Sequence, residues 1–301
     1  MSDDGIFENI PENAYHADRG SLSVSGAKKL IPPSCPAKFR WEQDNPPESN
    51  PVFDFGRIAH GLVLGVGGEC VVLDPAVHGL KKDGTVADSP RATATWKDAE
   101  AEARAAGLTP VHVDDYRTAK QMADAVRKHP EAAAILAAGK PEQSLYATDP
   151  ETGVQLRGRV DWIRPDGEID DYKTSSTANP DELERKFYTY GYFMQAAWYM
   201  DLAITLGITE TPRFRFIVQE KTPPFLVSVI EYDPEDIIEG RRRNRIAINT
   251  YAECMSSGVW PGYGIGTHTI RLPRWAFTAR DQAIYDEAGE LETNWEDFIA
   301  S

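Results

Sequence analysis

Cysteine is scarce in this sequence of 301 residues. The three cysteines, Cys35, Cys70 and Cys254, are far apart in the chain. This spacing excludes a disulfide framework and a paired-cysteine zinc site, and it is typical of a reducing compartment. The chain also lacks any run of roughly 20 apolar residues, which excludes a membrane-spanning helix. Its acidic start, MSDDGIFENI, does not resemble a signal peptide, so we expect a cytoplasmic protein.

Positive charge is in short supply as well. Lys and Arg number 32 against 47 Asp and Glu, which gives a net charge of −15. Proteins that hold DNA by neutralising its phosphates usually have a basic balance, so the composition argues against nucleic acid as a partner. It does not exclude a local basic surface, because electrostatic steering depends on the distribution of charge. The apolar content of 41% predicts a globular chain with a substantial core.

Hydrophobic periodicity predicts groups of helices and strands along the chain. The expected helices cover residues 21–30, 35–43, 53–65, 179–206 and 234–257, together with a mostly helical stretch over 96–138 that is interrupted at 107–114. The expected strands cover residues 71–74, 143–148, 154–163, 168–174, 213–220 and 225–232, and residues 44–51 and 76–95 are expected to be loops. This order predicts an α/β fold with a mixed central sheet flanked by helices. We expect a single domain over residues 1–301, with a mainly helical part at 1–140 that carries His60 and a sheet-bearing part at 141–301.

The segment GRVDWIRPDGEIDDYK, at residues 158–173, places acidic side chains on a β-hairpin. Its Pro-Asp-Gly sequence at 165–167 suits a three-residue loop. Counting back from that loop sets Asp161 opposite Asp171, with Lys173 on the same face as Asp171. Opposed like charges are destabilising unless a cation lies between them. Two interpretations fit this spacing: a divalent metal site, or a solvated hairpin whose acids point into water.

A histidine and a glutamine raise the same kind of question. His60 ends the apolar run GRIAH, where a lone histidine is more often a core residue than a metal ligand. One face of the long helix expected after residue 179 carries a stripe of four residues: Tyr188, Tyr192, Gln195 and Tyr199. Aromatic stripes are normally core packing. A buried amide needs several hydrogen-bond partners, however, which favours a polar cleft beside Gln195.

Five elements in this order resemble those of the PD-(D/E)XK nucleases: GRIAHGLVL, an upstream Glu, GRVD, DDYKT and YGYFMQAAWY. The resemblance is to the phage and prophage RecE-type exonucleases (exonuclease VIII) of the RecB-like branch, and it covers about residues 21–260. It implies the restriction-endonuclease-like fold. It also implies processive 5′-to-3′ digestion of linear double-stranded DNA, which leaves 3′ single-stranded tails for recombination.

The resemblance also implies roles for individual residues. The implied metal ligands are His60, Asp161, Asp171 and the backbone carbonyl of Tyr172, and the implied catalytic residues are Asp161, Asp171, Lys173, Gln195 and Tyr199. Lys173 would orient the attacking water and stabilise charge on the phosphate, and Glu142 matches a further upstream acid of the family. The expected cofactor is Mg²⁺, while the histidine would suit Mn²⁺ equally. Some relatives use four cysteines for an iron–sulfur cluster, which these three scattered cysteines do not predict.

The DNA-binding surface is a separate expectation. The candidates are Arg157, Arg159, Lys28, Lys38 and Arg40. The basic run RRRNR at residues 241–245 fits a solvated helix face better. Related enzymes form closed rings and act with single-strand annealing proteins, so we expect a homo-oligomer, an annealing partner and no membrane in a bacterial host cell or prophage setting.

Two other functions remain open. An endonuclease on the same fold would cut closed circular DNA or RNA, which an exonuclease would spare. A catalytically silent nucleic-acid-binding module is disfavoured, because degenerate copies usually lose at least one of the three residues Asp161, Asp171 and Lys173, and all three are present.

Overall fold

A mixed β-sheet of seven strands forms the centre of the computed structural model, which describes residues 3–45, 54–66 and 70–272. The strands are β1 (Gly5–Phe7), β2 (Leu22–Ser23), β5 (Lys140–Thr148), β6 (Gln155–Ile163), β7 (Ile169–Ser175), β8 (Phe214–Glu220) and β9 (Val227–Ile230). They lie in the order β1, β5, β6, β7, β8, β9, and β2 pairs with β6. The β7–β8 and β2–β6 pairs are parallel and the others antiparallel. The predicted mixed sheet is therefore confirmed.

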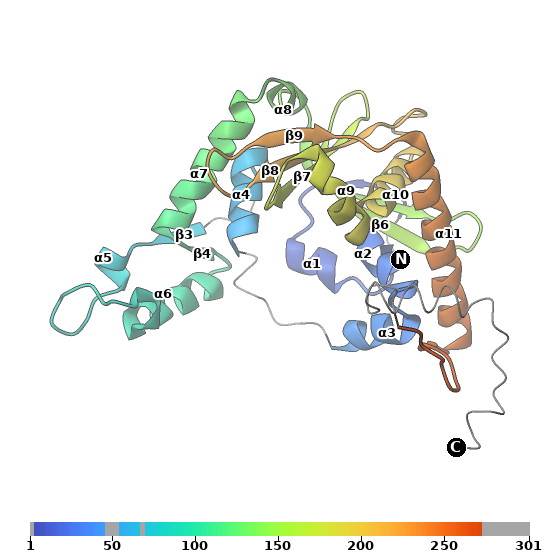
Figure 1. Cartoon of the computed structure of the whole chain (residues 1–301), viewed down its shortest axis with the longest axis horizontal. Coiled ribbons are helices and arrows are strands. Elements are labelled where there is room, and N and C mark those ends of the chain that lie inside the picture. The colour runs from blue at the N-terminus through green and yellow to red at the C-terminus, as the bar shows by residue number, and fades with distance from the viewer. Residues whose placement is uncertain (1–2, 46–53, 67–69, 273–301) are drawn as a thin grey trace, which may run out of the picture. The chain divides into compact units, whose positions relative to one another are not determined.

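Helices cover both faces of this sheet (Figure 1). The first face packs against α2 (Val24–Leu30), α10 (Tyr192–Thr205) and α11 (Pro234–Ser257), and the second against α4 (Asp54–Leu64), α7 (Val113–Lys128) and α8 (Pro130–Ile135). Successive side chains of a strand pack against the helices on opposite faces of the sheet. Phe216 and Val218 of β8 join the α10 cluster, whereas Ile217 joins the α7 cluster. The remaining helices near this sheet are α1 (Glu12–Ala17), α3 (Pro36–Asp44) and α9 (Pro180–Thr189).

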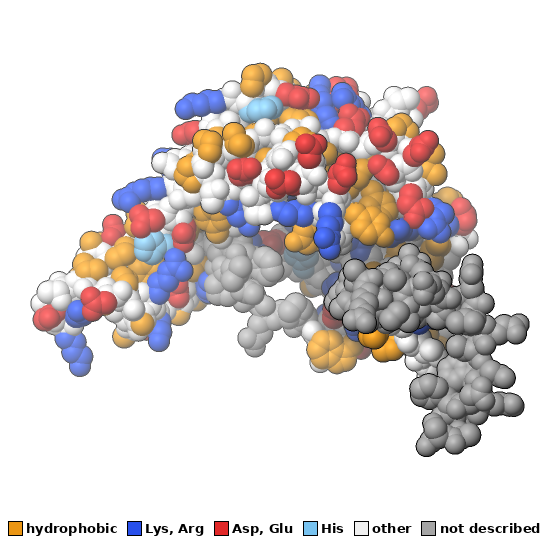
Figure 2. Space-filling model, viewed as in Figure 1, with side chains coloured by type: hydrophobic (Ala, Val, Ile, Leu, Met, Phe, Trp, Pro, Cys, Tyr) orange, Lys and Arg blue, Asp and Glu red, His pale blue; other side chains and the backbone are white. Residues whose placement is uncertain are grey.

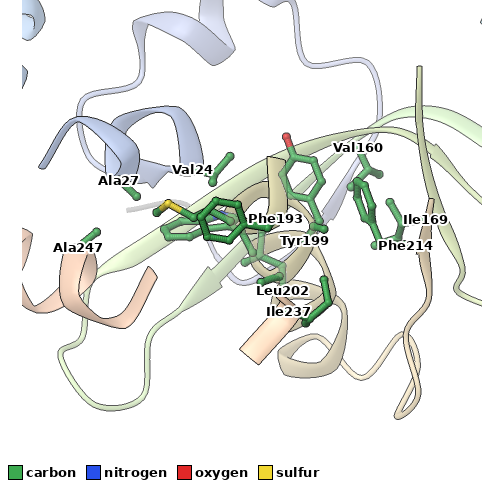
Figure 3. Close-up of a cluster of buried hydrophobic side chains, with 14 of the residues drawn as sticks. Val24, Ala27, Val160, Ile169, Phe193, Tyr199, Leu202, Phe214, Ile237 and Ala247 are labelled. Carbon is green, nitrogen blue, oxygen red and sulfur yellow. The ribbon is translucent and has the colours of Figure 1, made fainter. Parts of the chain in front are cut away.

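The larger core lies around α10, where Phe193, Tyr199 and Leu202 meet Val24 of α2 (Figure 3). Nine residues of α10 are buried, because the helix is enclosed between the sheet and α11. The two helices approach closely at Gly240, where an added Cβ would lie 2.5 Å from the carbonyl oxygen of Phe193. This tight packing fixes α10 as the rigid support for the side chains that it presents to the sheet.

A second, two-stranded parallel sheet joins β3 (Cys70–Leu73) to β4 (Thr109–His112). It is accompanied by α5 (Pro75–His78), the 3₁₀ helix η2 (Pro90–Ala92) and α6 (Ala94–Ala105). The strand predicted at 71–74 is confirmed as β3, but β4 and the short helices within the predicted loop at 76–95 were not predicted from the sequence. β4 has four residues, of which Pro110 lacks a backbone donor, so its local strand signal is weak.

The single helix predicted over 179–206 is wrong, because the chain breaks there into α9 and α10. Gly191 lies at the break with a φ of 61°, a left-handed conformation that glycine adopts readily. Tyr188 therefore belongs to α9, where it is 63% exposed, and does not share a helical face with the other residues of the predicted stripe. Tyr192, Gln195 and Tyr199 remain together on α10.

Residues 1–262 form one compact unit and residues 263–301 a second. The elements above and the candidate site lie in the first unit, and the single nuclease domain expected over 1–301 stays a prediction. The predicted loop at 44–51 falls mostly on residues 46–53, outside the described part of the chain. Among the described residues, no helix combines the length and the apolar character needed to cross a membrane.

Candidate active site

The hairpin of β6 and β7 forms as predicted. The amide of Arg164 donates to the carbonyl of Glu168 at 2.9 Å, and Gly167 takes the left-handed position of the loop with a φ of 84°. The backbone pairing that follows the loop has the register that sets Asp161 across from Asp171. The turn sequence alone therefore places the two acids on neighbouring strands.

The two strands part at Asp161. The backbone amide of Tyr172 donates to the Asp161 carboxylate at 2.9 Å, where a regular ladder would use a strand carbonyl. On either side of Asp161, Val160 joins the core cluster on the α10 face and Trp162 the cluster on the α4 face. The alternation of side chains is thus interrupted at Asp161, and its carboxylate meets α4.

Three side chains converge at this interruption: His60 of α4, Glu142 of β5 and Asp161 of β6. His60 Nε2 lies 3.0 Å from a carboxylate oxygen of Asp161, and His60 Nδ1 lies 3.4 Å from a carboxylate oxygen of Glu142. One ligand atom from each residue lies within 4.8 Å of the others. One imidazole nitrogen and two carboxylate oxygens form a donor set suited to a hard divalent cation.

Local structure explains how these side chains reach one another. The apolar residues Ile58 and Ala59 of α4 pack against α7, which leaves His60 at the side of the helix that faces the sheet edge. Glu142 stands opposite Asp161 in the β5–β6 register but does not pair with it, and its φ is 51°. Positive φ is costly for a residue with a side chain, and such conformations cluster at functional sites.

Asp171 and Lys173 form the second half of the site. Asp171 is 2% exposed, accepts a hydrogen bond from the Gln195 side-chain amide at 2.6 Å and forms an ion pair with Lys173. Gln195 thus has the hydrogen-bond partner that a buried amide requires, while the polar cleft expected beside it stays a prediction. The Lys173 ammonium lies 5.3 Å from the centre of the Tyr192 ring, and that of Lys28 lies 5.6 Å from it. The aromatic ring supports the two cations beside the buried carboxylate.

The charges of the acid cluster depend on one another. Burial lowers the pKa of His60, but the carboxylates of Asp161 and Glu142 outweigh it and raise the pKa to about 9. Burial raises the pKa of Asp161, but the cations of His60 and Lys173 outweigh it and hold the pKa below its usual value. Without a metal, His60 is therefore protonated at neutral pH, and a cation that binds its ring must displace that proton.

The pKa values of Asp171 and Lys173 on the hairpin are also shifted by their neighbours. Burial and the nearby charge of Asp161 raise the pKa of Asp171. Burial lowers the pKa of Lys173, but Asp171 and Asp161 outweigh it and raise the pKa above its usual value. Lys173 is thus held as an ammonium donor among carboxylates at physiological pH.

A cleft of about 600 Å³ opens onto the acid cluster. Besides the cluster it is lined by Arg57, Arg159, Tyr15 and Tyr199. Arg57 and Tyr15 were not among the site residues predicted from the sequence. Arg57 precedes His60 by three residues, and this spacing places both on one side of a helix, so that signal was available. Tyr15 lies under the Arg159 guanidinium, 4.3 Å from it, and has no comparable signal in the sequence.

The two arginines predicted to bind DNA lie beside this cleft and are held by protein atoms. Arg157 is 7% exposed and donates to the carbonyl oxygens of Asp18 and Ser21. Arg159 donates to the carbonyl oxygen of Ile10 at 2.7 Å. Their guanidinium groups therefore brace the N-terminal segment against β6.

The other predicted cations lie in different places. Lys28 is beside Lys173, while Lys38 and Arg40 lie on α3, where Arg40 pairs with Asp44. The arginines of the run at 241–245 are each paired with a carboxylate of the protein: Arg241 with Asp201, Arg242 and Arg243 with Glu239, and Arg245 with Asp149. These ion pairs support the interpretation of residues 241–245 as a helix face and not as a DNA-binding surface.

The fold and the site agree with the class of PD-(D/E)XK proteins. Residues 23–272 match the model of the family described as PDDEXK-like domain of unknown function (DUF3799), and this chain belongs to that family. The predicted PD-(D/E)XK fold is therefore confirmed.

Solved structures were compared as well. A candidate exonuclease from Eubacterium rectale has 12% sequence identity and a TM-score of 0.57, over 89% of this chain and 96% of that one. At this identity the likeness supports the fold alone. A phage-related exonuclease from Haemophilus somnus 129PT has 17% identity over 67% of this chain and 95% of that one, with a TM-score of 0.26. The comparison with curated proteins gives no match.

Proposed function

We propose that this protein is a metal-dependent exonuclease that hydrolyses linear double-stranded DNA. The observation that carries the proposal is the convergence of His60, Glu142 and Asp161 next to the Asp171–Lys173 pair on the neighbouring strand. Membership of a PDDEXK-like family supports the same class of reaction. Phosphodiester hydrolysis requires an activated water and stabilisation of negative charge, and this set of side chains has groups for both tasks.

The donor atoms fit a divalent metal ion. Mg²⁺ prefers oxygen ligands, and the imidazole suits Mn²⁺ as well, so we propose that either ion is held by His60, Glu142 and Asp161. Asp171 and the carbonyl of Tyr172 are proposed as further ligands. When bound, the ion supplies Lewis acidity and lowers the pKa of a water molecule.

The remaining groups position the reactants. The Lys173 ammonium donates hydrogen bonds to the attacking water and to a phosphate oxygen, and it stays charged because Asp171 and Asp161 flank it. Gln195 fixes one oxygen of Asp171 through its amide, which leaves the other oxygen toward Lys173. Tyr199 lines the cleft at Asp161 and limits the room for the substrate.

Finer features of the activity rest on the resemblance to RecE-type exonucleases. We propose processive 5′-to-3′ digestion that leaves 3′ single-stranded tails for recombination. We also propose a homo-oligomeric ring, a single-strand annealing protein as partner and a cytoplasmic location in a bacterial host cell.

Digestion of linear duplex DNA and of covalently closed circles, each with Mg²⁺ or Mn²⁺, tests the proposal. Wild type, Lys173→Ala and the control Lys82→Ala, on an exposed loop, are compared at equal concentration. We expect wild type and Lys82→Ala to degrade the linear DNA and spare the circles, and Lys173→Ala to degrade neither.

The other outcomes assign the chain to the alternatives. Cutting of circles by wild type, abolished by Lys173→Ala, would make the protein an endonuclease on the same site. No cutting of either substrate with either metal would contradict the DNA nuclease and leave an RNA-directed endonuclease or the binding module.

A further inference from the structure

A second cavity, of about 330 Å³, begins at Lys173. It lies at the end of β7 and is enclosed by α9, the start of α10 and the end of β8. Its polar lining includes Lys173, Lys186 and Lys221, and its aromatic lining includes Tyr190 and Tyr192. We call this space the lysine cavity. None of its residues is shared with the lining of the cleft at the acid cluster.

The lysine cavity is cationic in a protein of net charge −15. Among the residues that the structure describes, its lining contains no Asp or Glu, whereas the cleft at the acid cluster is lined by Glu12, Glu142 and Asp161. Within residues 3–45, 54–66 and 70–272, neither Lys186 nor Lys221 forms an ion pair. Lys186 donates to the hydroxyl of Ser176 instead.

This arrangement contrasts with the arginine run at 241–245, whose four arginines are all paired with carboxylates of the protein. In the region where Figure 1 places α9, Figure 2 shows Lys and Arg side chains beside a large exposed hydrophobic side chain, with Asp and Glu side chains nearby. Cations that line a cavity and form no ion pair with the protein can bind an anionic ligand, such as the phosphates of a nucleic acid.

The aromatic residues of the cavity indicate which other part of a nucleic acid would bind beside the phosphates. Tyr190 is 60% exposed, and its ring is stacked against Tyr192 with 5.5 Å between the ring centres. Tyr192 in turn lies beneath the Lys173 ammonium. Lys28 donates to the carbonyl of Tyr190 at 2.9 Å, which holds the α9–α10 junction in place. Lysines interleaved with exposed aromatic rings are the usual surface for an unpaired strand, because a base exposes its face for stacking once it leaves the duplex.

We propose that the lysine cavity binds a single-stranded segment of DNA that continues from the phosphate at Lys173. Lys186 and Lys221 contact backbone phosphates of this segment, and Tyr190 stacks with one of its bases. The inference rests on the proposed function, because it assigns Lys173 to the reacting phosphate. It supplies a DNA-binding surface in an acidic chain without recourse to the paired arginines.

Binding of a fluorescein-labelled oligo-dT strand, followed by fluorescence anisotropy in EDTA, tests the proposal without hydrolysis. The variants are K186E/K221E and Tyr190→Ala, with Lys82→Glu as the matched control for charge reversal on an exposed lysine. Thermal melts establish that each variant is folded.

The expected effects separate phosphate contacts from stacking. K186E/K221E weakens binding at least about tenfold and makes the negative slope of log K against log salt shallower by about 1.4, which is about 0.7 for each of two phosphates on a single strand. Tyr190→Ala weakens binding about tenfold and leaves that slope unchanged. Lys82→Glu binds as wild type does.

Two results would overturn the inference: cavity variants that bind as tightly as wild type, or a Lys82→Glu control that loses as much affinity as they do. Digestion of linear DNA by wild type with Mn²⁺ separates this failure from failure of the proposed function. If wild type digests DNA but the cavity variants bind normally, the lysine cavity is wrong and the nuclease stands. If wild type digests nothing but the variants lose oligo-dT binding, the nuclease is wrong and the binding site stands.

Discussion

Two consecutive aspartates on β7 lie in opposite environments. Asp170 is 1% exposed and accepts a hydrogen bond from the Arg215 guanidinium at 2.8 Å, and the same guanidinium bonds Glu168 at 2.7 Å. Asp171 is 2% exposed, but its partners are the Gln195 amide and Lys173. The two residues have equal burial and the same chemistry, and only the alternation of the strand separates them.

The difference separates a structural ion pair from the pair that we propose to be catalytic. The planar guanidinium of Arg215 donates to both Asp170 and Glu168 and holds these two carboxylates in place. On the other face, Asp171 belongs to a group of acids that includes Asp161 and Glu142 and whose charge is balanced in part by a proton on His60. A cation can replace that proton, and this exchange makes the Asp171 face suited to metal chemistry.

The largest expected effect concerns Asp161, the acid shared by His60 and the hairpin. Asp161→Asn removes a proposed metal ligand, so we expect Mn²⁺ binding by calorimetry to be lost and hydrolysis of linear DNA to fall about a thousandfold, the equivalent of about 4 kcal/mol. Arg215→Lys on the opposite face serves as the control, and we expect it to bind Mn²⁺ as wild type does. Unchanged Mn²⁺ binding by Asp161→Asn would remove the metal from this face.

Asp170→Asn is expected to act on stability. It leaves the buried Arg215 with one carboxylate partner fewer, which costs about 3 kcal/mol of unfolding free energy in urea. Hydrolysis per folded molecule is expected to stay within about twofold of wild type, because Asp170 does not face the acid cluster. Loss of activity in a folded Asp170→Asn protein would contradict the assignment of a structural role to Asp170 and a catalytic role to the Asp171 face.

Gln195→Ala tests how Asp171 is positioned, because the Gln195 amide donates a hydrogen bond to the Asp171 carboxylate. Loss of the amide donor frees the buried carboxylate to shift, and we expect a decrease of about ten- to a hundredfold in the rate at saturating DNA. Gln195→Glu places a like charge beside Asp171 and is expected to be worse than alanine. Equal rates for wild type and both variants would mean that the contact with Asp171 has no part in positioning it.

A further prediction concerns pH and the metal-free protein. The pKa of His60 is raised from 6.5 to about 9, so its interactions with Asp161 and Glu142 contribute stability that is fully present below about pH 6.5 and lost as the pH rises through about 9. Thermal midpoints measured in EDTA across this range should fall more for wild type than for His60→Gln. A parallel decrease in both proteins would contradict the protonated state of His60.

The hairpin could be predicted from the sequence because a tight turn fixes its register. Pro165 and Gly167 define the loop, whose register sets Asp161 opposite Asp171, and alternation along β7 puts Lys173 on the same face as Asp171. The interruption of the alternation at Asp161 does not follow from the turn. Gln195 could be predicted too, because a buried amide in an apolar helix requires a polar partner. These inferences depend on local geometry.

The missed features depend on contacts between distant parts of the chain. β4 is a strand only because β3 pairs with it, and its own four residues include a proline. The proximity of Glu142 to His60 requires α4 to pack beside β5. The lysine cavity joins Lys173, Lys186 and Lys221 from three separate elements, so its charge is invisible in a count of residues.

The most direct test of the account compares Asp170→Asn with Asp171→Asn in one experiment. Linear duplex DNA is digested with Mn²⁺ at equal concentrations of folded protein, as determined from unfolding curves. The account predicts that Asp170→Asn digests the DNA at nearly the wild-type rate and that Asp171→Asn leaves it intact. Digestion by Asp171→Asn at the wild-type rate would contradict the assignment of this face of β7 as the active site.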